Sequence, residues 1–148
     1  MINPLRALRY SGWLGAEIVK GALTVARDAF TPGTAISPAI IELPLRCVTD
    51  LEVSLMASSI TITPGTVTLG IAAARGETPP TLFVHAIYGQ DPEEVRAGLL
   101  DMEQHLLAMT RGKDAPGPDD PPRPTAAPPA GGSPAAARHT SDRAQEAT

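Results

Sequence analysis

The chain of 148 residues contains a single cysteine, Cys47, and aromatic residues make up only 3% of it. One cysteine excludes an internal disulfide framework and is compatible with a reducing compartment. Large apolar residues are missing after Met109, where Ala and Pro are the only apolar types, and eight of the sixteen prolines fall within residues 113–148. Such a segment buries too little surface to offset its ordering entropy. The sequence therefore predicts a disordered tail over 113–148 and one folded unit of ordinary domain size before it.

An excess of positive charge is also missing. The net charge is −4, and residues 1–112 carry 8 basic against 11 acidic side chains. A nucleic-acid-binding surface needs a basic surplus, so this class of partner is not expected.

The longest uncharged run, residues 53–74, is long enough for a transmembrane helix, but its sequence is not that of one continuous apolar helix. Pro64 and Gly65 divide it and suit the central positions of a tight turn. The residues from Thr66 onward alternate with the period of a strand. We therefore expect the end of a helix, a turn and the start of a hairpin. Residues 1–12 lack the apolar core of a secretory signal.

The first helix is predicted over residues 11–29, with its polar side chains in one narrow stripe. The expected organisation has four parts: a leader over 1–12, a membrane- or complex-docking helix over 13–34, a cytoplasmic α+β domain over 35–112, and the tail. Two interpretations of the helix stay open. It is an amphipathic helix that covers a sheet, or an interfacial or complex-embedded helix whose apolar surface exceeds what one small sheet needs. With four charges it is a poor membrane span by itself.

The remaining segments predict the order α–β–α–β–β–α and hence an α+β domain with three strands. Pro38 and Pro44 cannot donate to a sheet ladder, so the extended segment 36–45 is expected at an edge. Thr49 and Glu52 form a capping box that opens a helix to about residue 59. A hairpin pairs 66–74 with 81–88, and Asp91 caps the last helix, with Pro92 at its first position and Glu94 completing a box. The expected core face of that helix comprises Val95, Leu99, Met102, Leu106 and Met109.

Catalytic and metal-binding patterns are not found. Ser58, Ser59 and His85 include a nucleophile and a base, but no nucleophile-elbow motif surrounds either serine. His85, His105 and His139 are scattered and form no metal cluster, and no phosphate-binding glycine loop is present. We expect no enzyme activity, no cofactor and no metal site, with Cys47 as a buried apolar residue.

Five segments in order resemble the E subunit of the Mrp-type (Mnh/Mrp) multisubunit Na+/H+ antiporters, the MrpE/MnhE family. They are AEIVKGALTVA (16–26), ISPAII with TDL (36–41, 49–51), ASSITITPGT (57–66), LFVHA (82–86) and DPEEV (91–95). The third is the most specific, and its residues Ser59, Thr61, Thr63, Pro64, Gly65 and Thr66 match the family motif. Family members usually begin with further hydrophobic segments, whereas this chain starts just before the last of them, so a full multi-span anchor is not expected.

The resemblance implies an accessory subunit of a membrane complex that exchanges Na+ for H+ and supports pH and sodium homeostasis. Its implied partners are the integral-membrane subunits and the membrane, without nucleic acid or a small-molecule substrate, and its implied location is the cytoplasmic face of the cell membrane. Ion translocation belongs to the large subunits, and Glu17 and Lys20 pair with each other or with a neighbouring subunit. The expected docking residues are Trp13, Leu14, Glu17, Ile18, Lys20, Leu23, Val25 and Phe30.

Two rival hypotheses remain. In the first, the chain is a soluble interaction or regulatory module whose first helix completes its own core. In the second, it is a small hydrolase that uses Ser58 or Ser59.

Overall fold

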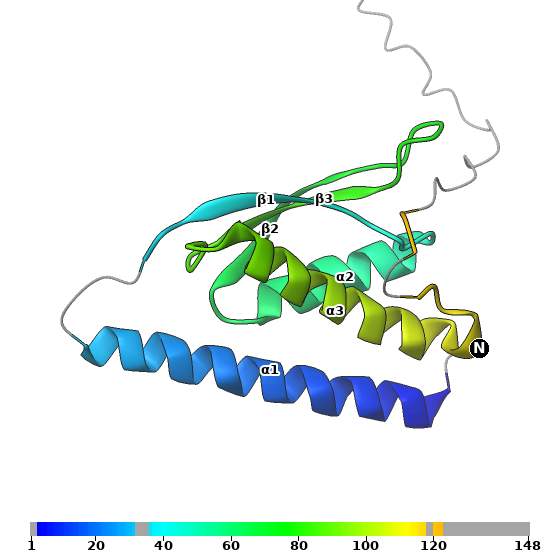
Figure 1. Ribbon diagram of the computed structural model, residues 1–148. Coiled ribbons are helices and arrows are strands. Elements are labelled where there is room, and N and C mark those ends of the chain that lie inside the picture. The colour runs from blue at the N-terminus through cyan, green and yellow to red at the C-terminus, as the bar shows by residue number, and fades with distance from the viewer. Residues whose placement is uncertain (1–2, 32–35, 118–119, 123–148) are drawn as a thin grey trace, which may run out of the picture.

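A computed structural model describes residues 3–31, 36–117 and 120–122. Its elements follow the predicted order, which confirms the α+β fold class (Figure 1). They are α1 (Pro4–Phe30), β1 (Ala39–Pro44), α2 (Asp50–Ile62), β2 (Thr66–Ala72), β3 (Thr81–Ala86), α3 (Pro92–Thr110) and a short 3-10 helix (Gly112–Asp114).

The first helix begins seven residues earlier than predicted, at Pro4 rather than at residue 11. Pro4 occupies the first turn, where its missing N–H costs nothing, and the Asn3 side chain accepts a hydrogen bond from the Leu5 N–H at 3.0 Å. Residues 4–12 of the predicted leader are therefore helical, and α1 extends over 27 residues.

The three strands form one antiparallel sheet in the order β1-β3-β2. The prediction that the two prolines place β1 at an edge is confirmed, because among the described strands only β3 lies beside it. The other edge strand, β2, pairs with β3 through a register shift between Thr68 and Gly70. The hairpin is confirmed with shorter strands than predicted.

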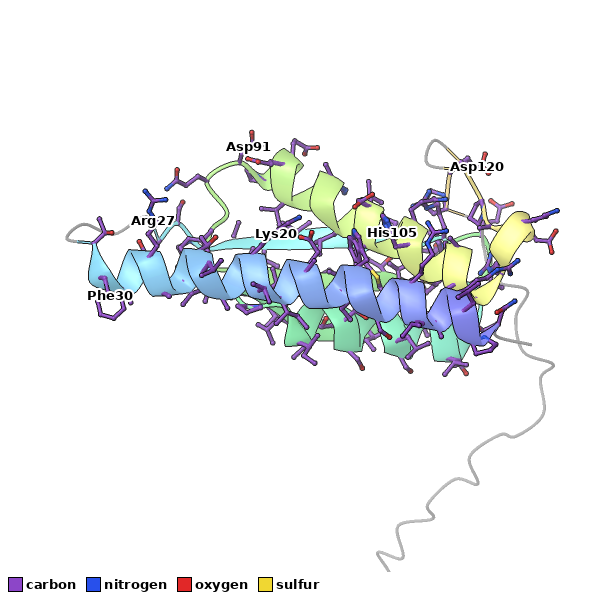
Figure 2. All side chains as sticks on the ribbon, turned by 90° about the horizontal axis from the view of Figure 1, so that it is seen from below. Lys20, Arg27, Phe30, Asp91, His105 and Asp120 are labelled. Atoms are coloured by element: carbon purple, nitrogen blue, oxygen red, sulfur yellow. The ribbon has the colours of Figure 1, made fainter. Side chains whose placement is uncertain are left out.

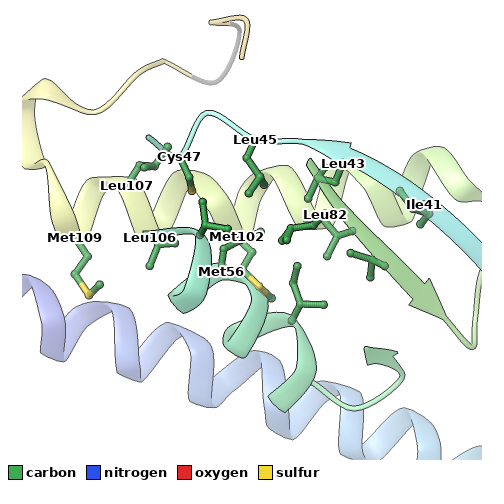
Figure 3. Close-up of a cluster of buried hydrophobic side chains, with 14 of the residues drawn as sticks. Ile41, Leu43, Leu45, Cys47, Met56, Leu82, Met102, Leu106, Leu107 and Met109 are labelled. Carbon is green, nitrogen blue, oxygen red and sulfur yellow. The ribbon is translucent and has the colours of Figure 1, made fainter. Parts of the chain in front are cut away.

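The protein has three layers, with the sheet on one side, α2 and α3 beneath it, and α1 beneath the two helices (Figure 1). The core lies between the sheet and the helix pair, where Leu43, Leu82 and Val84 of the sheet meet Met56 and Leu106 (Figure 3). The first helix thus covers helices rather than the sheet. The opposite face of the sheet is not covered by any described element, and Ile40 on it is exposed.

Side-chain caps fix the beginnings of α2 and α3. The capping box of Thr49 and Glu52 is present as predicted, and α2 continues three residues past the predicted end. At α3, Asp91 accepts hydrogen bonds from the Glu93 and Glu94 backbone N–H groups. The prediction that Glu94 completes a box is wrong, since among the described contacts its side chain makes no bond back to Asp91. Four of the five predicted core residues of α3 are buried, and Val95 is half-buried.

The first residues of the predicted tail pack against the domain. Gln104 donates a hydrogen bond to the Pro116 carbonyl at 3.0 Å, and Arg46 donates one to the Gly117 carbonyl at 2.7 Å. Most of the tail, residues 118–119 and 123–148, lies outside the described residues, and so does His139.

Candidate functional site

Two aromatic side chains attach the first half of α1 to the helix pair. The Tyr10 hydroxyl shares a buried hydrogen bond of 2.7 Å with the Ser59 hydroxyl of α2. The Trp13 indole stacks on the His105 ring of α3, with the ring centroids 4.2 Å apart and the planes 10° apart. Burial is the main cause that raises the pKa of Tyr10, so its phenol stays neutral and keeps this hydrogen bond at physiological pH.

Two further contacts attach the second half of α1. Gly21 lies so close to Pro64 that an added Cβ would come within 3.1 Å of the Pro64 carbonyl oxygen. Near the end of the helix, the Tyr88 hydroxyl donates to the Asp28 carboxylate at 3.2 Å. The inward face of α1 is therefore held by a few contacts that depend on shape and on hydrogen-bond geometry.

The residues matched to the family motif build the surface on which α1 rests. Hydroxyl groups donate to carbonyls in the last turns of α2: Thr61 to the Ala57 carbonyl, Thr63 to the Ser59 carbonyl and Thr66 to the Ile60 carbonyl, at 2.8–2.9 Å. Such local hydrogen bonds from side-chain hydroxyls to the backbone are typical of a turn segment rich in threonine.

The turn after α2 requires Gly65, which has a φ of +96°, a value that disfavours side chains. It brings the chain into β2 and places Pro64 against Gly21. Ser59 and Pro64 of the motif are thus contact points for α1.

The opposite, outward face of α1 is apolar along the whole helix. Its eight residues follow one another at spacings of three or four, which places them on one side of a helix. Each is exposed: Leu5, Leu8, Gly12, Ala16, Val19, Leu23, Ala26 and Phe30. Phe30, at the end of the helix, is 90% exposed (Figure 2). We call this set the outward row.

The predicted docking residues divide between the two faces of α1. Leu23 and Phe30 belong to the outward row, and Val25 is also exposed. Trp13 and Leu14 are half-buried and pack against the core of the protein itself, and Ile18 is half-buried too.

Glu17 and Lys20 form an ion pair with a separation of 2.6 Å, which confirms their predicted pairing. Lys20 and Arg27 lie on the side of α1 that is turned toward α3 in Figure 2. The outward row is therefore bordered on one side by two basic side chains, of which Lys20 is paired with Glu17.

Sequence reasoning missed two ion pairs, the first fully buried and the second partly buried. Glu103 of α3 is fully buried, and its carboxylate accepts from the Arg46 guanidinium at 2.9 Å and from the Cys47 backbone N–H at 3.1 Å. Arg46 is itself buried and also donates to the Leu100 carbonyl. Glu103 follows Leu99 by four residues and precedes Leu106 by three, so its place on the apolar face of α3 was visible in the sequence.

The second pair joins Glu52 of α2 to Arg111 at the end of α3. The Arg111 guanidinium contacts both carboxylate oxygens of Glu52, at 2.8 and 2.5 Å. Burial opposes ionisation of Glu52, but hydrogen bonds from Arg111, Thr110 and the Val48 and Thr49 backbone N–H groups outweigh it and lower the pKa to about 2. The hydrogen bond to Glu52 raises the pKa of Arg111 in turn. The Glu52–Arg111 pair therefore stays ionised and joins α2 to the end of α3.

The candidate catalytic residues are not brought together. Ser59 is engaged with Tyr10 on the helix side of the sheet, whereas His85 pairs in register with Ile40 and Val67 on the open face. Cys47 is fully buried as predicted, and burial followed by the charges of Glu103 and Glu52 raises its pKa, which keeps the thiol protonated. The part of the chain that the structure describes contains no cluster of His, Cys, Asp and Glu able to hold a metal.

Among the described residues, no helix, α1 included, combines the length and the apolar character needed to cross a bilayer.

Three similarities to known proteins bear on this architecture. The family model of the "Na+/H+ ion antiporter subunit" matches residues 1–109. The E subunit of the Na(+)/H(+) antiporter of Alkalihalophilus pseudofirmus is 28% identical over 96 residues, which cover 64% of this chain and 58% of that protein. The chain thus matches somewhat more than half the length of this relative.

A solved structure has the same fold. A chain in the structure of the Mrp complex from Dietzia sp. is 37% identical and superimposes with a TM-score of 0.57 over 74% of this chain and 99% of that one. The chain therefore belongs to the MrpE/MnhE family of Mrp-type Na+/H+ antiporter subunits, a family of transporter components rather than enzymes.

Proposed function

We propose that this protein is an accessory subunit of a membrane complex that exchanges Na+ or another cation for H+, and that the outward row of α1 docks onto the membrane subunits. The observation that carries the proposal is the length of this row, which runs from Leu5 to Phe30, almost the whole of α1, without a charged residue. A contiguous exposed apolar surface of this kind is typical of an interaction site.

The spacing and residue sizes of the outward row suit a partner helix. Apolar residues at alternating spacings of three and four form the seam of packed helix pairs. Gly12 and Ala16 lie four residues apart in that row, and small residues at this spacing let two helix backbones approach closely in membranes. Leu8 and Val19 flank them with larger side chains.

A role in assembly rather than in the ion path agrees with the pairing of the ionisable groups. An ion path needs ionisable side chains that can change partners at membrane depth. Glu17 forms an ion pair with Lys20 on the same helix. The carboxylates of Glu52 and Glu103 form ion pairs with arginines of the folded domain. We place this domain at the cytoplasmic face of the membrane, with α1 between it and the membrane subunits.

The test is co-purification with the membrane subunits after co-expression, followed by cation-dependent proton exchange in vesicles. Leu23→Glu puts a charge into the outward row at a side chain that is 65% exposed, and it should reduce the recovered complex at least tenfold. Leu51→Glu is the matched control, because Leu51 is 58% exposed on α2, outside the row. Equal recovery of the two variants, or a wild-type chain that never co-purifies, would refute the docking proposal.

The soluble interaction module stays a second candidate, because the inward face of α1 completes the core of this chain through Tyr10. It predicts a monomer that needs neither detergent nor membrane subunits and whose α1 resists proteolysis. Exposed apolar residues along the outward row count against it. Sedimentation of the purified full chain, with and without the membrane subunits, separates the two candidates.

A further inference from the structure

A cavity of about 400 Å³ lies between the first turns of α1 and the end of α3. Arg6, Arg9 and Lys113 line it together with the stacked rings of Trp13 and His105. These residues come from both ends of the folded chain, so only the packing of α1 on α3 brings them together.

The charge of this cavity is positive and uncompensated. No carboxylate belongs to its lining, and within the described residues none of its three cations forms an ion pair. Two acids close to these residues in the chain do not line the cavity: Asp101 lies 3.5 Å from the His105 ring, and Asp114 follows Lys113.

The backbone just after α3 lies against the Arg6 side chain. Gly112 has a φ of +66°, and a Cβ at this position would collide with the Arg6 guanidinium. The Arg6 guanidinium thus lies directly over the Gly112 backbone, whose positive φ favours glycine, and Arg9 follows one turn later on the same helix.

We propose that this cavity binds the phosphate group of an anionic phospholipid. Arginine and lysine together are the usual donors to phosphate, since their hydrogen bonds to it are charge-assisted. Leu5 and Leu8, beside the cations on α1, are 69% and 71% exposed; they form the first turns of the outward row and reach the acyl region when the phosphate is bound, while the row from Gly12 onward faces the membrane subunits. Trp13 supplies the amphipathic ring that favours the headgroup level. The choice of a lipid over free phosphate rests on the proposed membrane function.

Trp13 is the only tryptophan, so its fluorescence reports on the cavity alone. The purified full chain is titrated with phosphatidylcholine vesicles that contain phosphatidylglycerol, with pure phosphatidylcholine vesicles, and with inorganic phosphate at matched phosphate concentration. We expect a saturable blue shift with the first only. The triple variant Arg6→Gln, Arg9→Gln and Lys113→Gln should bind roughly a hundredfold more weakly, and Lys113→Gln alone about fivefold.

The matched control removes the same charge elsewhere, through Arg27→Gln, Arg75→Gln and Arg96→Gln. It should bind within about twofold of wild type. Equal weakening of both triple variants would mean diffuse attraction and overturn the proposal. The same holds if inorganic phosphate alone produces the saturable shift, if pure phosphatidylcholine binds equally well, or if no vesicle binds. Because this titration contains no membrane subunit, its failure leaves the co-purification test of the proposed function unaffected.

Discussion

The two faces of α1 differ in what they contact and in how they are built. The inward face joins the domain through the Tyr10–Ser59 hydrogen bond and the close approach of Gly21 to Pro64. The outward face presents large and small apolar residues, and Leu23 and Phe30 on it are exposed. The inward contacts depend on shape and on single polar atoms, whereas the outward row offers a general apolar surface. Changes on the two faces should therefore separate folding from assembly.

The largest expected loss of stability follows from protonation or replacement of Glu52, in the domain that supports the inward face of α1. The pKa of Glu52 is about 2 in the folded protein, below the usual 4.5, so its contribution to stability is complete above pH 4.5 and is lost as the pH falls toward 2. Glu52→Gln should remove about 3 kcal/mol of unfolding free energy at pH 7. Urea unfolding between pH 7 and pH 3 measures both effects. A wild-type stability that does not change over this range would contradict the assigned role.

The next largest loss of stability is expected for a valine substitution at Gly21 of α1, in contrast to the same substitution at Gly12. Gly21→Val should destabilise the protein by about 1–3 kcal/mol, because the new side chain meets Pro64 and pushes α1 away from the helix pair. Gly12→Val is the matched control: nothing lies within 4 Å of a Cβ at Gly12, and its effect should stay within about 0.5 kcal/mol. Thermal unfolding of both variants provides the comparison, and equal values would mean that the inward contact is not tight.

A smaller effect is expected at the buried hydroxyl pair. Tyr10→Phe keeps the ring and removes the 2.7 Å bond to Ser59, whose hydroxyl still donates to the Leu55 carbonyl. The cost should be about 1 kcal/mol, that of one neutral hydrogen bond. Chemical denaturation followed by Trp13 fluorescence measures it. Ser59→Ala should give a similar loss, and the double variant should lose little more than either single variant.

The smallest effect on stability is expected at the outward row, where the effect on assembly is large. Leu23→Glu should leave the free energy of unfolding of the isolated chain within about 0.5 kcal/mol of wild type, since the side chain is 65% exposed. Together with loss of the complex, this result would establish that the two faces are independent. A strong destabilisation of the isolated chain would instead assign the row to the fold.

Local signals in the sequence predicted most of the fold. Prolines placed β1 at the edge, the Thr49 and Glu52 box opened α2, and Asp91 capped α3, because each of these features acts within a few residues. The start of α1 was predicted too late because the cap at Asn3 and Pro4 was overlooked in favour of the apolar pattern.

The buried pairs and the cavity depend on residues that lie far apart in the chain. Glu103 and Arg46 are 57 positions apart, and no periodicity links them. The predicted docking set mixed both faces of α1 for a related reason: an apolar residue such as Leu14 has the same character whether it packs inside or faces a partner.

By itself, the sequence determined the order of helices and strands, the family and the surplus of apolar surface on α1, since these follow from local spacing and composition. Only the tertiary structure decided which side of α1 is used by the domain and which stays available, because that choice depends on where Ser59 and Pro64 come to lie. It also decided that Arg6, Arg9 and Lys113 share one cavity, since they are joined by packing rather than by position in the chain.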